Sequence, residues 1–148
     1  MTTRKSPADS PATLSSPKDP KTLAMAITEA AWSKNAYDTR VLDVSNIASF
    51  TDMFVILSGR SDRHVIAISA EIEKALKTKR ILPSGVEGRQ SGTWILMDYG
   101  DVVVHVFEKS VREFYELEKL WTDAVEIPVT EPQWVKDFER MENQPETW

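Results

Sequence analysis

The stretch that decides the fold runs from residue 93 to residue 107 and reads TWILMDYGDVVVHVF. Two apolar runs, Trp94–Met97 and Val102–Phe107, flank a polar tetrapeptide that contains Gly100. Runs rich in Val, Ile and aromatic residues on both sides of a short Gly-containing segment are typical of an antiparallel β-hairpin. We therefore predict a hairpin at the centre of the fold.

The loop of this hairpin sets its predicted register. If Tyr99 and Gly100 form a two-residue loop, Asp98 faces Asp101 across the turn. The predicted pairs are then Met97 with Val102, Leu96 with Val103, Ile95 with Val104, and Trp94 with His105.

Both faces of the predicted hairpin are apolar, because side chains alternate between the two faces of a strand. One face carries Ile95, Met97, Val102, Val104 and Val106, and the other carries Trp94, Leu96, Val103, His105 and Phe107. A face in contact with water would be expected to carry polar side chains. We expect the protein's own helices to cover one face. Either further helices or a binding partner covers the other, and the hairpin pattern leaves both open.

The rest of the chain predicts a mixed sheet packed with helices, an α/β (α+β) fold. Met53–Leu57 is continuously apolar, as in a central strand that is buried on both faces. Ser110 and Glu113 form a capping-box pattern for a helix after the hairpin. That helix would bury Val111, Phe114, Leu117 and Trp121. The other expected elements are a helix from Asp19-Pro20 to near Asn35, a strand at Val41–Ser45, a helix from Ser61 or Asp62 to Thr78, and a loop at 81–92.

We expect three regions along the 148 residues. Residues 1–18 are rich in Pro and Ser and are expected to be a disordered tail. Residues 19–125 form the folded domain, and residues 126–148 form an acidic C-terminal extension. Within that extension, the interval Pro132–Asn143 is consistent with one short helix.

Composition narrows the class of partner. The formal charge of -5 makes the chain a poor general binder of nucleic acid, whose affinity rests on Lys and Arg meeting phosphates. A basic protein surface is a more natural partner, and we expect no direct sequence-specific binding of nucleic acid. The chain has no cysteine and no apolar run of membrane-spanning length, so a cytoplasmic protein without membrane association is expected.

The residues offer little for catalysis. Gly59–Ser61 follows a strand and enters a helix but lacks the established phosphate-binding patterns. Asp98 and Asp101 leave open an acid–base or metal pair in a nucleotidyltransferase-like enzyme, although turn formation explains both. His64 and His105 lack metal-ligand spacing. We expect no cofactor and no metal.

Five segments of the chain resemble the Iojap-like ribosomal silencing factors over about residues 22–125. They are Thr51–Ile56, Ser58–Val65, Gly85–Gly88, Trp94–Phe107 and Arg112–Trp121. The resemblance implies a nucleotidyltransferase-like mixed sheet without catalytic carboxylates, and a protein that is not an enzyme. It also implies a homodimer off the ribosome.

The resemblance further implies translational repression during starvation or in stationary phase. The implied partner is the fourteenth protein of the large ribosomal subunit, bound at the intersubunit face so that the small subunit cannot join. An assembly factor for the large subunit is the alternative. The implied contact residues are Trp94, Leu96, Met97, Asp98 and Tyr99. Met97 has the opposite strand parity to Trp94 and Leu96 and is the member of this set closest to a core residue.

Overall fold

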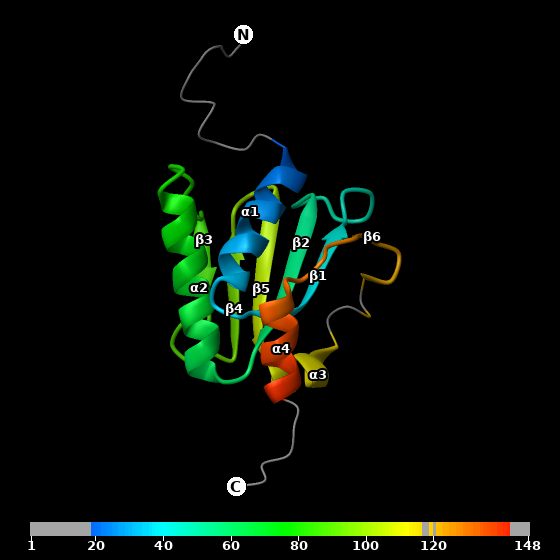
Figure 1. Cartoon of the computed structure of the whole chain (residues 1–148). Coiled ribbons are helices and arrows are strands. Elements are labelled where there is room, and N and C mark those ends of the chain that lie inside the picture. Colours follow the sequence, from blue (N-terminus) through cyan, green and yellow to red (C-terminus); the bar gives the residue numbers. More distant parts are fainter. Residues whose placement is uncertain (1–18, 117–118, 120, 143–148) are drawn as a thin grey trace, which may run out of the picture.

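The computed structural model describes residues 19–116, 119 and 121–142, so the expected tail at 1–18 lies outside the described residues. Within them, one mixed sheet has the strand order β3-β4-β5-β2-β1-β6 (Figure 1). In chain order the elements are α1 Pro20–Trp32, β1 Tyr37–Asp43, β2 Met53–Gly59, α2 Asp62–Lys77, β3 Gly85–Glu87, β4 Trp94–Asp98, β5 Val102–Glu108, α3 Lys109–Tyr115, β6 Val125–Ile127 and α4 Gln133–Glu142.

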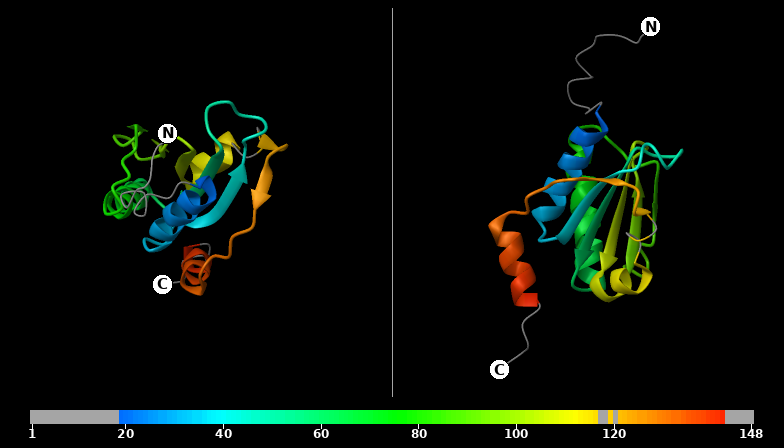
Figure 2. Two further views of the ribbon diagram at one scale, coloured as in Figure 1. Left: turned by 90° about the horizontal axis from the view of Figure 1, so that it is seen from above. Right: turned by 90° about the vertical axis from the view of Figure 1, so that its right-hand side faces the viewer.

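The centre of the sheet is the parallel pair formed by β2 and β5, and the other strand pairs are antiparallel. Every residue of β2 is buried, which confirms the prediction of a central strand covered on both faces. Helices α1 and α2 pack side by side over one face of the sheet (Figures 1 and 2). The mixed sheet with packed helices confirms the predicted fold class.

The helical face holds the larger core. Ser61 caps α2 by accepting a hydrogen bond from the backbone N–H of His64 at 3.1 Å. The apolar side chains of α2 recur at helical spacing and point into the sheet. The fully buried members of this core include Ile27, Val55, Leu57, Val65, Ile68, Ile72, Leu76, Ile95, Met97, Val102, Val104 and Val106.

The hairpin of β4 and β5 is present, but its predicted register is wrong by two residues. Asp98 pairs with Val103 and not with Asp101. The backbone N–H of Tyr99 donates to the carbonyl of Val102 at 2.9 Å, so the two-residue loop consists of Gly100 and Asp101. Gly100 has a φ of +84°. Only glycine adopts such a φ readily. Because a shift of two residues keeps the strand parity, the two predicted faces are correct.

Three further expectations differ from the structure. The interval 81–92 contains β3, whose three residues pair with β4. Glu108, and not Ser110, caps α3: its carboxylate accepts from the backbone N–H of Ser110 at 3.1 Å. Helix α3 ends at Tyr115, because the next residue, Glu116, has a left-handed φ of 50°.

Phe114 and Trp121 do not share the buried stripe that a longer α3 would have given them. Phe114 is 79% exposed, whereas Trp121 is partly buried beyond the helix end. Leu117 lies outside the described residues.

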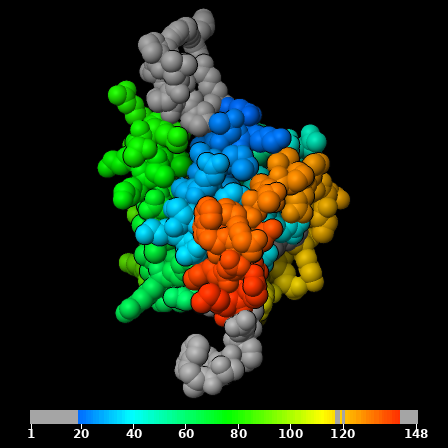
Figure 3. Space-filling model, in the orientation of Figure 1, coloured from blue at the N-terminus to red at the C-terminus, as the bar shows by residue number. Residues whose placement is uncertain are grey.

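The C-terminal segment lies against the domain. The expected boundary at residue 125 falls inside β6, which pairs with β1. Helix α4 follows, and its Val135 is fully buried with Trp32 and Tyr37. The indole N–H of Trp134 donates to the carbonyl of Trp32 at 3.2 Å. Figure 3 shows α4, in orange and red, against α1 on this side of the molecule. No helix among the described residues has the length and apolarity needed to cross a membrane.

Val135→Ala tests whether α4 is part of the folded unit. It removes buried methyl groups from the contact with Trp32 and Tyr37. We expect the free energy of unfolding to fall by about 2 kcal/mol in urea titrations. The neighbouring Lys136→Ala, at an exposed position, should change it by less than about 0.5 kcal/mol. Equal stabilities of the two variants would show that α4 contributes nothing to folding.

Candidate protein-interaction surface

The sheet face opposite α1 and α2, here called the open face, is covered by fewer elements. Figure 2 shows α1, α2 and α4 on one side of the sheet, with α3 and the loop between β1 and β2 on the other. Side chains from the strands themselves do much of the covering. The buried residues of this face are Leu42, Val44, Phe54, Ile56, Val103 and Phe107, and partly buried ones are Ala48, Trp94, Leu96, Val111, Trp121 and Ala124.

Trp94 is held rigidly on the open face, near the edge of the sheet. Its indole N–H donates to Nδ1 of His105 at 3.1 Å. Its ring stacks on Phe107 with 4.8 Å between centroids and contacts Tyr115 at 5.1 Å. Part of the side chain stays exposed, so an oriented aromatic surface faces the solvent.

His105 supports Trp94 as a neutral imidazole. It is buried, and burial lowers the pKa of His105 to about 4. Since Nδ1 accepts the hydrogen bond from Trp94, the proton of the neutral ring belongs on Nε2. The edge-to-face contact with Phe54, at 5.0 Å, fixes the ring further. His105 therefore orients Trp94.

The five residues that the resemblance implies as contacts divide between the two faces. Trp94, Leu96 and Asp98 lie on the open face, where Leu96 pairs with His105 across the hairpin. The carboxylate of Asp98 accepts from the backbone N–H of Gly100 at 2.8 Å and stays partly exposed.

Met97 and Tyr99 belong to the helical side. Met97 is fully buried in the helical core, and Tyr99 packs against the same core. Burial raises the pKa of Tyr99 to about 12, so its phenol is neutral at physiological pH. Met97 can influence a partner only through the packing of β4, because no part of it reaches the surface.

Sequence reasoning missed exposed apolar residues on two other segments. Ile47 and Phe50 lie in the loop between β1 and β2, and Phe114 and Tyr115 lie at the end of α3. Phe114 was expected in a buried stripe, and nothing local in the sequence marks Phe50 as a surface residue. The tertiary contacts of Phe50 with Phe54 and Trp121 place it beside the open face.

The geometry gives little support to an acid–base or metal site at Asp98 and Asp101, or to phosphate binding at the start of α2. The observed register removes the pairing of Asp98 with Asp101 on which an acid–base site was to be built. Among the residues that the structure describes, no group of three or more His, Cys, Asp and Glu could hold a metal ion. At the start of α2, the backbone N–H of Arg60 donates to Nδ1 of His64 at 2.9 Å, so the protein itself occupies this donor.

The burial of His105 predicts a pH-dependent stability. Because the folded state has a pKa near 4 and the unfolded chain one of about 6.5, the unfolded chain binds the proton more readily between these values. The contribution of neutral His105 is present above pH 6.5 and is lost as the pH falls toward 4. The loss should reach up to about 3 kcal/mol.

The measurement is urea unfolding of the wild type and of His105→Gln at several values between about pH 7 and pH 4. Gln keeps an acceptor for the indole of Trp94 and does not titrate. The stability advantage of the wild type over this variant should shrink as the pH falls. An advantage that stays constant over the range would show that His105 titrates normally in the folded protein.

Comparisons with known proteins place this architecture in a family. The family model described as "Ribosomal silencing factor during starvation" matches residues 17–147. Ribosomal silencing factor RsfS of Bacillus subtilis is 45% identical over 91 residues, which are 62% of this chain and 77% of that protein. The mouse protein named "Mitochondrial assembly of ribosomal large subunit protein 1" is 39% identical over 92 residues, which are 60% of this chain and 40% of that one.

A solved structure shows the same fold. The crystal structure of a protein from Chromobacterium violaceum superimposes with a TM-score of 0.69 and 34% identity, over 70% of this chain and 87% of that chain. The family model spans all of the described residues, including β6 and α4. The motifs in β2, β4 and β5 and the matched family model agree, and the chain belongs to the Iojap-like family of ribosomal silencing factors.

Proposed function

We propose that this protein represses translation by binding the large ribosomal subunit and preventing the small subunit from joining it. The proposed contact is the fourteenth large-subunit protein, at the intersubunit face, in the cytoplasm of cells in starvation or stationary phase. Membership of the silencing-factor family supports the general role. The partner and the mode of action are the proposal.

The observation that carries the proposal is the partly exposed pair Trp94 and Leu96. Hot spots of protein interfaces are rich in Trp and are preorganised in well-packed surroundings. The hydrogen bond to His105 and the stack on Phe107 hold Trp94 in this way before any partner arrives. Asp98 follows on the same face and offers a carboxylate to a basic protein surface.

The mechanism is steric. A compact domain of about 120 residues has a radius of gyration of about 14 Å. A body of this size, anchored at the face where two subunits meet, occupies the space that the incoming subunit needs. Occupancy alone then represses translation, and the mechanism requires no catalytic residue.

Trp94→Ala should weaken binding to purified large subunits by about 30-fold, the loss expected of an aromatic hot spot. Co-sedimentation of the full chain with separated subunits, at low and moderate salt, measures this loss. The wild type should bind the large subunit alone and reduce subunit joining as its concentration rises.

Trp134→Ala is the matched control, because it removes an exposed Trp from α4 on the other side of the sheet. It should bind like the wild type. If Trp94→Ala lowers the melting temperature sharply while the folded fraction binds normally, Trp94 is a core residue and the contact site lies elsewhere.

A second candidate function is assembly of the large subunit, and the name of the mouse relative favours it. Both functions need the same docking, so binding data do not separate them. Cells that lack the protein separate the two: silencing leaves large subunits mature in growing cells, whereas an assembly role makes immature large subunits accumulate.

We also propose a homodimer off the ribosome, which sedimentation velocity over a range of concentrations would detect.

A further inference from the structure

The residues of β4 form only a small part of a stable interface. Specific protein complexes bury about 800 Å² on each partner, contributed by 20 to 30 residues. Trp94, Leu96 and Asp98 are each already partly buried, so their remaining exposed surface is well short of this area. A partner that docks here must also contact neighbouring segments of the open face.

A continuous run of ring contacts leads from Trp94 to one such segment. Centroid distances are 6.0 Å from Trp94 to His105, 5.0 Å from His105 to Phe54, and 6.0 Å from Phe54 to Phe50. This run crosses β4, β5 and β2 and ends in the loop between β1 and β2, residues 44–52. Phe50 is 63% exposed there, beside the exposed Ile47.

The charged residues of this loop and of the neighbouring turn between β4 and β5 are all acidic. The backbone N–H of Asp52 donates to the carbonyl of Asp101 at 3.1 Å, which joins the loop to the turn between β4 and β5. Segments 43–53 and 97–103 together hold four aspartates and contain no Lys or Arg. One of them, Asp43, accepts two hydrogen bonds from Ser45, at 2.7 and 3.0 Å, which lower the pKa of Asp43.

The other exposed end of the open face differs in charge. Around Phe114 and Tyr115 the chain carries both signs, with Lys109, Arg112, Glu113, Glu116 and Lys119. At the loop between β1 and β2, the exposed apolar side chains are therefore flanked along the chain by aspartates and by no Lys or Arg. This combination is complementary to a protein patch with apolar residues at its centre and Lys or Arg around it. RNA is disfavoured, because its phosphates would meet carboxylates.

We infer that the docking surface extends from Trp94 to the loop between β1 and β2, with Phe50 as a second apolar anchor, and that the partner surface there is basic protein. The inference rests on the proposed function and specifies the chemistry of its partner. It assigns Phe50 to apolar contact, and Asp52 and Asp101 to charge complementarity.

Two variants and two matched controls test it with purified large ribosomal subunits as the probe. Phe50→Ala should weaken binding about 10-fold. Leu82→Ala removes a side chain of similar exposure, 65% against 63%, from the segment that follows α2, and should leave binding unchanged.

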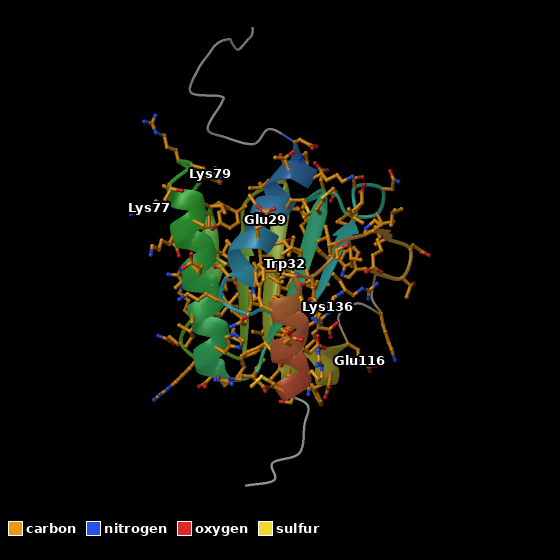
Figure 4. All side chains as sticks on the ribbon, in the orientation of Figure 1. Glu29, Trp32, Lys77, Lys79, Glu116 and Lys136 are labelled. Atoms are coloured by element: carbon orange, nitrogen blue, oxygen red, sulfur yellow. The ribbon has the colours of Figure 1, made fainter. Side chains whose placement is uncertain are left out.

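Asp101→Lys should slow association at low salt about fivefold, with a smaller effect at high salt. Glu29→Lys makes the same charge change on α1, away from the open face (Figure 4), and should have no effect.

The outcomes distinguish this inference from the function on which it rests. If Trp94→Ala weakens binding while Phe50→Ala and Asp101→Lys bind like the wild type, the extension is overturned and the proposed function stands. If the wild type binds neither subunit, both are overturned. Equal binding to protein-free large-subunit RNA, lost in the same variants, would also overturn the inference, because the partner would then be nucleic acid.

Discussion

The parallel pairing of β2 with β5 is the constraint on which the rest of this structure depends. Both strands are buried along nearly their whole length, so neither face of the central sheet can be left to water. Helices α1 and α2 satisfy this requirement on one face. On the other, the chain offers the short α3, one loop and a set of aromatic side chains. Because both faces are apolar but only one is covered by long helices, the open face is the natural place for a partner.

Strand alternation made much of this architecture predictable. It assigned Trp94 and Leu96 to one face and Met97 to the other. That assignment is correct although the predicted register was wrong by two residues, because a shift of two residues does not change the face of a side chain. The register itself depends on the φ of Gly100 and on the hydrogen bond to Asp98, two local details that apolar periodicity does not contain. The end of α3 likewise depends on the left-handed backbone conformation of Glu116. No pattern in the sequence predicts that conformation.

The proposed interaction surface was less predictable, for a topological reason. Phe50 and Trp94 are distant in sequence and become parts of one surface only because β2 pairs with β5 and β5 pairs with β4. Reasoning from a single motif includes sequence neighbours such as Tyr99, whose side chain packs on the opposite side of the sheet. The same reasoning omits Phe50, whose position beside the open face depends on contacts with Phe54 and Trp121.

A steric repressor needs a rigid contact surface more than it needs chemistry. Conformational freedom lost on binding lowers affinity, so a side chain fixed in advance binds more tightly than a mobile one. Trp94 is fixed by a buried His105 whose pKa lies well below physiological pH. Its ring therefore stays neutral, and its hydrogen bond to Trp94 persists, across the pH range of a starving or growing cell. In the proposed mechanism, occupancy of the ribosome by this surface would depend on the concentration of the protein and on its partner, and not on protonation of His105.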